Sequence, residues 1–371
     1  PRVMEEMLDA VRFWMDLGID GFRLDAVPYL IEAEGTNCEN LPGTHKILKQ
    51  LRAMVDEEYP GRILLCEANQ WPDDVVEYFG NGDECQMAFH FPVMPRLYMG
   101  LRRGSRECIS EILAHTPHIP DGCQWGTFLR NHDELTLEMV TEEDRHYMWE
   151  EYAPESRWRC NLGIRRRLSP LVDNDDAKIR LLNAMLLSLP GSPVLYYGDE
   201  IGMGDDPWLP DRDGVRTPMQ WDDSETAGFS TALPEDFHLP LIRTFGHDPE
   251  HVNVARQMDD PSSLLVWTRA MLGIRRHHPV FGTGEFTDLG GPDMAVMSFL
   301  RHNEHETVLC LANFSDTERM VALHLPQFAG MTGSSLIHGQ DAQPVKADGT
   351  LSVPLWPYGY RWLQMSREER S

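Results

Sequence analysis

Three short apolar runs, each with an acidic residue at or near its end, constrain this chain more than any other feature of its sequence. They occupy residues 21–27, 62–67 and 126–133. Each run has the length of a β-strand, and segments with helical periodicity lie between them. Strands that alternate with helices predict an α/β fold with a parallel sheet.

The acidic residues in these runs are Asp25, Glu67 and Asp133. Asp25 and Glu67 are 42 residues apart, and Glu67 and Asp133 are 66 apart. A strand–helix unit needs upwards of about 30 residues, so the first interval fits one unit and the second fits two. A further strand is expected at residues 86–91. The three carboxylates would then lie at the C-terminal ends of parallel strands, where the loops of a barrel form its active site.

Arg23 lies two residues before Asp25 in what is predicted to be a buried strand. Because side chains alternate between the two faces of a strand, Arg23 and Asp25 are expected side by side. An ion pair inside a strand is most often structural. The two further carboxylates in similar positions favour a site over that interpretation.

The charge and cysteine content exclude several classes of partner and fold. The net charge is -26 at pH 7, which argues against nucleic acid and against an anionic membrane surface, since both require a basic face. The seven cysteines are scattered and never spaced as C-x-x-C, so neither a disulfide framework nor a structural zinc site is expected. A reducing cytoplasm fits this pattern best.

Two helices are predicted from their terminal residues, one at the start of the chain and one near residue 260. Residues 2–16 predict an amphipathic helix that Gly18 ends, and not a signal peptide. A chain that opens inside a helix looks like a fragment. The second of these helices is expected to begin at Asp260 and Pro261, a capping residue followed by proline.

We divide the chain into a partial barrel at residues 1–279 and a C-terminal β-sandwich at residues 280–371. Within the barrel, residues 135–176 are too long for an ordinary loop, and their tryptophans argue against disorder. We expect a helical insertion that acts as a lid, in which the basic run 165–167 is either functional or a solvated face. Short alternating runs after residue 279 predict antiparallel strands. These runs are residues 296–300, 307–313, 320–325, 334–338 and 360–363.

Carboxylates gathered in one pocket suit the cleavage of a glycosidic bond. One carboxylate attacks or stabilises the sugar carbon, and one carboxylic acid protonates the leaving oxygen. Repulsion between neighbouring carboxylates should keep one of them protonated at neutral pH, as a general acid requires. A magnesium or manganese site for phosphoryl or enolate chemistry is the competing interpretation. The chain has no glycine-rich phosphate loop to support it.

The motifs around these residues resemble the α-amylase superfamily of retaining glycoside hydrolases and transglycosylases, glycoside hydrolase family 13. The sequence Gly-Phe-Arg-Leu-Asp at residues 21–25 resembles the fourth-strand motif of that family, and Asn-His-Asp at residues 131–133 resembles its seventh-strand motif. The resemblance implies the C-terminal portion of a (β/α)8 TIM barrel, strands four to eight, followed by an antiparallel all-β domain. It further implies a nucleophile, an acid/base and a transition-state stabiliser, namely Asp25, Glu67 and Asp133.

Other residues acquire expected roles in the same way. Substrate binding is implied for Arg23 and His132, and for Arg216 in the sequence Gly-Val-Arg-Thr-Pro-Met-Gln-Trp, which predicts a pocket and not an open cleft. A calcium ion is implied beside the fourth-strand loop, with Glu32 and the carbonyl groups of Tyr29 and Leu30 as candidate ligands. No organic cofactor is expected.

Within the superfamily, four stretches resemble the trehalose synthases, which interconvert maltose and trehalose. They are residues 25–45, 88–96, 130–138 and 357–362. The resemblance implies intramolecular glucosyl transfer on a disaccharide, and it allows a homo-oligomer and a maltose kinase partner. A hydrolytic α-glucosidase or another transglucosidase is the alternative, and a non-catalytic scaffold on this fold is the alternative of another class. Because the first three strands of the family have no counterpart here, we expect an incomplete barrel with little or no activity.

Overall fold

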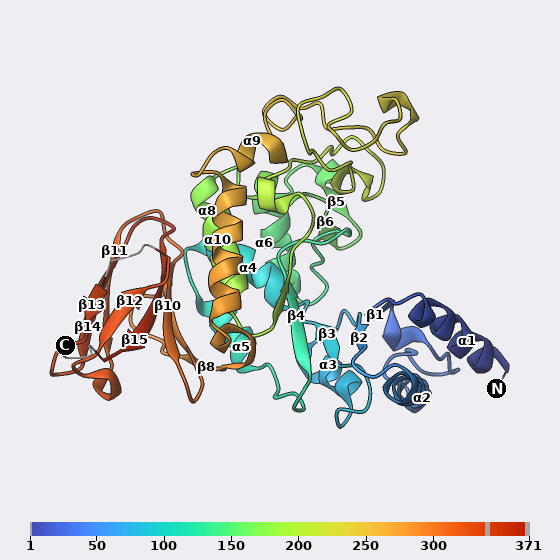
Figure 1. Cartoon of the computed structure of the whole chain (residues 1–371), viewed down its shortest axis with the longest axis horizontal. Helices are drawn as coiled ribbons and strands as arrows, with labels where there is room; N and C mark the ends of the chain where they lie inside the picture. Colours follow the sequence, from blue (N-terminus) through green and yellow to red (C-terminus); the bar gives the residue numbers. More distant parts are fainter. Residues whose placement is uncertain (1, 338–341, 368–371) are drawn as a thin grey trace. The chain divides into compact units, whose positions relative to one another are not determined.

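The computed structural model describes residues 2–337 and 342–367. The chain forms two compact units, which are described separately. The first contains residues up to 93 together with 112–127, and the second contains residues 94–111 and those from 128 onwards. Figure 1 labels the helices and strands of both. No helix in the described part of the chain is long and apolar enough to cross a membrane.

The first unit is built on parallel strands, as the sequence predicts. β1 pairs with β2, β2 with β3 and β3 with β4, all in parallel. These strands are Gly21–Leu24, Ile63–Cys66, Met87–Phe89 and Gln124–Phe128. The helices of this unit are α1 (Arg2–Asp16), α2 (Pro42–Glu58) and α3 (Pro72–Val75), with 3-10 turns η1 (Val27–Tyr29) and η2 (Val76–Phe79), and α5 (Glu107–Ala114) includes residues of both units. The predicted helix over residues 2–16 is confirmed.

The core of this unit lies along β2 and β3, where Leu64, Cys66 and Ala88 are fully buried. By contrast, the prediction that the strand containing Arg23 is buried was wrong. Residues of β1 are only half-buried and Arg23 is exposed. The reason is that β1 ends the row of strands, so among the described residues a strand covers one of its edges only.

The second unit contains the predicted insertion at residues 135–176 and the helices that follow it. Its elements up to residue 283 are α4 (Val93–Arg103), α6 (Glu142–Tyr152), η3 (Ser156–Trp158), β5 (Arg159–Cys160), β6 (Gly163–Ile164), α7 (Leu168–Leu171), α8 (Asp176–Ser188), β7 (Ser192–Val194), η4 (Asp199–Ile201), η5 (Asp213–Val215), η6 (Pro234–Asp236), α9 (Val254–Met258), α10 (Leu264–His277) and α11 (Val280–Thr283). The insertion contains the helices α6 and α7, and it also holds the small antiparallel hairpin β5–β6, which the sequence did not predict.

The helix predicted to begin at Asp260 begins later. The Asp260 carboxylate accepts a hydrogen bond from the amide N–H of Ser262, 2.8 Å away, and so closes a turn. The cap of α10 is Ser263, whose hydroxyl oxygen accepts from the amide N–H of Val266 at 3.2 Å. Serine is as good a cap as aspartate, so the next available residue takes the position.

Antiparallel strands form the C-terminal region, red in Figure 1, as predicted. One sheet has the order β13-β12-β15-β10-β9-β8, and a second consists of β11 and β14. Side chains of both sheets, including Leu309, Val321 and Val353, share one apolar core. The strands are β8 (Glu285–Asp288), β9 (Val296–His302), β10 (Thr307–Asn313), β11 (Arg319–His324), β12 (Thr332–Ser335), β13 (Ala342–Pro344), β14 (Thr350–Leu355) and β15 (Tyr360–Ser366), with η7 at Pro326–Phe328. The end of the predicted run 334–338 lies outside the described residues.

Candidate active site

Arg23 joins the two carboxylates of the first unit. Its Nη1 atom donates to Oδ1 of Asp25, and its Nη2 atom forms an ion pair with Oε1 of Glu67. The predicted contact between Arg23 and Asp25 is therefore confirmed. The side chain of Asp25 is 75% exposed, whereas that of Glu67 is 17% exposed. The guanidinium group thus lies between an exposed carboxylate and a largely buried one.

The register of β1 and β2 explains this arrangement. Leu24 pairs with Cys66, so Asp25 and Glu67 are the next residues at the same ends of neighbouring parallel strands. The amide N–H of Glu67 donates to the carbonyl oxygen of Leu24 at 3.0 Å, which continues the ladder to the acidic residue itself. Ala26 then adopts a left-handed conformation with φ of 45° and directs its amide N–H to Oε2 of Glu67, 3.4 Å away.

Burial and charge act in opposite directions on Glu67. Burial raises the pKa of the Glu67 carboxyl group above its ordinary value, and the neighbouring Arg23 opposes that rise. A raised pKa is what a general acid needs near neutral pH. The two acidic residues of this unit therefore have different environments, as a glycosidase requires of its acid and its nucleophile.

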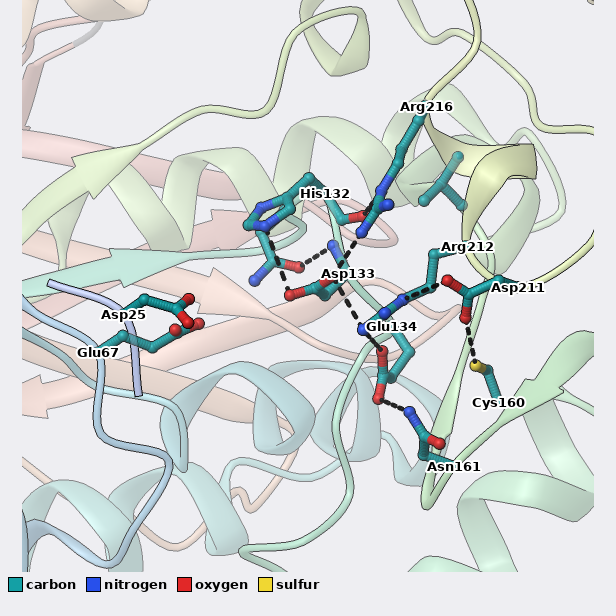
Figure 2. A network of polar contacts seen from close by, with 12 residues as sticks. Asp25, Glu67, His132, Asp133, Glu134, Cys160, Asn161, Asp211, Arg212 and Arg216 are labelled. Atoms are coloured by element: carbon teal, nitrogen blue, oxygen red, sulfur yellow. Dashed lines mark hydrogen bonds and ion pairs between the residues drawn. The ribbon is translucent and has the colours of Figure 1, made fainter. Parts of the chain in front are cut away.

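Asp133 is the centre of a second polar cluster, which lies in the second unit (Figure 2). Its Oδ1 atom accepts a hydrogen bond from Nη2 of Arg216 at 2.7 Å and lies 3.1 Å from Nη1 of Arg212. Its Oδ2 atom lies 3.5 Å from Nε2 of His132. Two guanidinium groups therefore share one oxygen of this carboxylate and leave the other facing the imidazole.

Asp133 does not lie in a strand, although the sequence predicted one to residue 133. β4 ends at Phe128, and arginine side chains bind backbone carbonyl groups of the segment that follows. The fully buried Arg130 donates from Nη2 to the carbonyl oxygen of Asp133 at 2.7 Å, and Arg216 donates from Nε to the carbonyl oxygen of His132 at 2.7 Å. These bonds fix a short loop that presents His132 and Asp133.

Arg216 also lines a pocket of about 500 Å³ in the second unit. Its walls include the exposed rings of Tyr197, Trp221 and Phe229, and its polar groups include Glu200. A mostly apolar pocket of a few hundred Å³ with a few polar groups is typical of a small-molecule site. Aromatic rings of this kind suit the apolar faces of a sugar.

Sequence reasoning missed Arg212 and Glu134 as members of the cluster. Arg212 lies in an irregular loop, four residues before Arg216, where no periodicity indicates which side chains turn inward. Glu134 directly follows Asp133, and its side chain is only 13% exposed. The adjacent acidic pair was the one available signal.

The basic run at residues 165–167 is not a solvated face. Arg165 donates to the carbonyl oxygens of Leu209 and Asp211, at 2.9 and 2.6 Å. The carboxylate of Asp205 accepts from Nε of Arg166 at 2.9 Å and from the amide N–H of Arg167 at 2.6 Å. The three arginines therefore bind the loop after β7 to the insertion.

The residues proposed to bind calcium do not form a cage. Tyr29 and Leu30 are 55% and 45% exposed, and Glu32 is also exposed. Among the described residues, no three acidic, histidine or cysteine side chains are grouped to hold a metal. Three oxygen ligands fall short of the six to eight that calcium takes. Calcium at this loop stays a prediction, and no step below depends on it.

Two protein-family models match most of the chain. Residues 1–284 match the alpha-amylase catalytic domain, and residues 290–362 match the maltogenic amylase C-terminal domain. The chain belongs to the alpha-amylase family. Arg23, Asp25 and Glu67, and the cluster around Asp133, all lie within the catalytic-domain match of this alpha-amylase family member.

Several curated relatives of this amylase-family chain are named trehalose synthases. A trehalose synthase/amylase TreS of Mycobacterium tuberculosis is 55% identical over 377 residues, which cover 100% of this chain and 62% of that protein. A trehalose synthase of Pimelobacter sp. is 55% identical, covering 99% and 66% respectively. One of Thermus thermophilus is 47% identical, covering 97% and 37%. The chain thus spans less than two thirds of the length of these relatives.

Solved structures of similar fold are found among sugar-acting enzymes. The alpha-amylase from H. orenii matches with a TM-score of 0.74 at 20% identity, covering 99% of this chain and 65% of that one. The trehalulose synthase MutB from Pseudomonas mesoacidophila matches with a TM-score of 0.70 at 22% identity, covering 99% and 69%. At this identity the likeness establishes the fold alone.

Proposed function

We propose that this chain carries the catalytic residues of a trehalose synthase, which converts maltose to trehalose by moving one glucosyl group within the disaccharide. The observation that carries the proposal is the pairing of Arg23 with both Asp25 and Glu67, with burial raising the pKa of Glu67. The names of relatives that are 47% and 55% identical support trehalose as the product.

The first chemical step uses both carboxylates of this pair. A carboxylate oxygen of Asp25 attacks the anomeric carbon of maltose while Glu67 donates its proton to the bridging oxygen. The glycosidic bond breaks, glucose leaves, and a covalent glucosyl ester forms on Asp25. Arg23 positions the two carboxylates relative to each other. The exposure of Asp25 and the burial of Glu67 suit attack by the first and proton donation by the second.

The second step reverses the first with a different acceptor oxygen. The released glucose turns, its anomeric hydroxyl attacks the anomeric carbon of the ester, and Glu67 takes the proton of that hydroxyl. Asp25 leaves as a carboxylate, and two inversions give net retention. In this proposal Asp133 stabilises the positive charge of the transition state, while His132 and Arg216 bind the glucosyl ring. The meeting of all three carboxylates in one pocket stays a prediction.

Isomerisation requires that water stay out while the glucose turns. We assign this exclusion to the insertion at residues 135–176. The bonds from Arg165, Arg166 and Arg167 attach the insertion to the loop after β7, which supports a role as a cover. A homo-oligomer, a maltose kinase partner and a cytoplasmic location belong to the same proposal. The free cysteines of the chain agree with a reducing compartment.

The test is an incubation with maltose in which trehalose, glucose and longer maltosaccharides are separated by chromatography. It is done with the 371-residue chain and with the same chain extended by the upstream barrel strands that the family resemblance implies. Trehalose as the main product, absent in Asp25→Asn and retained in Asp73→Asn, is the expected result. Asp73 is a matched control because it is an exposed aspartate of the same unit.

The other outcomes would assign the chain a different function. Glucose without trehalose would identify a hydrolytic α-glucosidase, and longer maltosaccharides would identify another transglucosidase. Both use the same first step, so Asp25→Asn would still abolish turnover. No product from the extended chain, or turnover that survives Asp25→Asn, would contradict the enzymatic assignment and leave a binding or scaffold protein.

A further inference from the structure

Arg212 lies among three carboxylates in the second unit (Figure 2). Its Nη1 atom is 3.1 Å from Oδ1 of Asp133 and 3.5 Å from Oε2 of Glu134. Its Nε atom is 3.2 Å from Oδ2 of Asp211. The guanidinium group therefore holds the proposed transition-state stabiliser together with Glu134 and Asp211.

Glu134 and Asp211 also contact the hairpin β5–β6 of the insertion. Oε1 of Glu134 accepts a hydrogen bond from Nδ2 of Asn161 at 2.8 Å. Oδ1 of Asp211 lies 3.7 Å from the thiol sulfur of Cys160. Asn161 occupies the turn of the hairpin with φ of 50°. Two short chains of contacts thus connect the hairpin turn to Arg212, and through it to Asp133.

The backbone holds this hairpin beside the loop of Asp133. Leu135 and Ile164 exchange amide-to-carbonyl hydrogen bonds of 2.8 and 3.0 Å. A Cβ atom on Gly163 would lie 2.4 Å from the carbonyl oxygen of Leu135, so only glycine permits this approach. The hairpin and the Asp133 loop are therefore in direct contact, and a displacement of the hairpin acts on Glu134 at once.

We propose that Arg212 is a positioning residue that sets the orientation of the Asp133 carboxylate according to the position of the hairpin. The inference rests on the proposed function. Arg212 and Arg216 bind the same oxygen of Asp133, so together they fix its rotation and leave Oδ2 towards His132. When the hairpin is in place, Arg212 is held by Glu134 and Asp211 and Asp133 is correctly set. When the hairpin moves, Arg212 loses those partners, so the covering of the site and the stabilisation of charge change together.

The shape of arginine is essential to this role. A planar guanidinium group offers donors in several fixed directions and can bridge Asp133, Glu134 and Asp211 at once. A lysine ammonium keeps the positive charge but is a single point on a flexible stem. Replacing Arg212 by lysine therefore separates the charge near Asp133 from the connection to the hairpin. If Arg212 only formed a structural ion pair, replacing it by lysine would leave the ratio of glucose to trehalose unchanged.

The experiment measures the ratio of glucose to trehalose, together with kcat/KM for maltose, in the extended chain. Arg212→Lys should keep most of kcat/KM but raise the ratio about 2- to 30-fold, the range typical of residues along a coupling path. Arg212→Gln should raise the ratio and also lower kcat/KM by about 100-fold, because Asp133 is misplaced. Asn161→Gly removes the hairpin contact without strain in the left-handed turn and should raise the ratio as Arg212→Lys does.

Leu162→Ala is the matched control, since Leu162 lies in the same turn, is 41% exposed and takes no part in these contacts. Its product ratio should equal that of the unchanged protein. If Arg212→Lys, Arg212→Gln and Asn161→Gly all gave the same product ratio as the unchanged protein, with melting temperatures that confirm folding, the inference would be overturned. If Arg212→Gln does not fold, Arg212→Lys and Asn161→Gly decide it. An unchanged protein that makes no trehalose would instead refute the proposed function, so the two failures are distinguishable.

Discussion

Replacing Asp199 by asparagine should change how the stability of the protein depends on pH. Asp199 is 5% exposed and forms an ion pair of 3.3 Å with the fully buried Arg167. Burial raises the pKa of Asp199 from 3.8 to about 6, although Arg167 and Arg130 oppose the rise. At about 1.4 kcal/mol for each pH unit, that difference corresponds to about 3 kcal/mol.

The sign follows from proton binding. Between pH 4 and pH 6 the folded protein holds the proton of Asp199 while the unfolded chain has released it, so the free energy of unfolding falls as pH rises through this range. Asparagine has the same shape and no proton to lose. The difference in unfolding free energy between the natural protein and Asp199→Asn should therefore fall by about 3 kcal/mol from pH 4 to pH 7, and stay constant above that.

Guanidinium unfolding followed by tryptophan fluorescence, at half-unit pH intervals, measures this difference. Taking a difference cancels the many other groups that titrate in both proteins. The lost contact with Arg167 shifts the whole curve of the variant but not its slope, because arginine stays charged throughout. A difference that is independent of pH, or one that grows as pH rises, would falsify the assignment of a raised pKa to this buried carboxyl group.

Three further predictions concern the site and its surroundings. The alkaline limb of kcat/KM for maltose should lie above pH 4.5, the ordinary pKa of glutamate, because Glu67 must keep its proton and burial raises its pKa; a limb at or below 4.5 would contradict the acid role. Asp205→Asn should lower the free energy of unfolding by about 3 kcal/mol, since it leaves Arg166 without its carboxylate partner in a largely buried position, and urea denaturation measures the loss against the exposed control Asp236→Asn. If calcium binds beside Glu32, titration calorimetry with the ion should give a signal that Glu32→Gln removes, whereas equal heats in both proteins would exclude that ligand.

The sequence predicted those features that depend on neighbours along the chain. Alternation within β1 is enough to place Arg23 beside Asp25. The contact of Arg23 with Glu67 was not predictable in the same way, because it requires the register in which Leu24 pairs with Cys66. The burial of β1 was overestimated for a related reason, since apolar residues in a strand do not reveal whether both edges are covered.

Loops account for the remaining differences. Two of the three partners of Arg212, Asp133 and Glu134, lie tens of residues away in sequence. β14 was missed although its residues alternate between buried and exposed. Pro354 within it argues against a strand unless the position tolerates a missing amide donor. It lies in a sheet of two strands, where each strand has a free edge among the described residues.

The three consecutive arginines bind the loop after β7 in reverse order. Arg167 donates to the carbonyl oxygen of Tyr197 at 2.7 Å, Arg166 binds Asp205, and Arg165 binds the carbonyl oxygen of Asp211. The two segments therefore run antiparallel, and the attachment nearest to Arg212 is the last of the series. Because Arg167 is fully buried and Arg165 is not, we expect the loop to open first at the Asp211 end while the Tyr197 end stays attached. Hydrogen exchange should accordingly decrease along the loop from residue 211 back to residue 197, so that the part beside the cluster around Asp133 is the first to exchange.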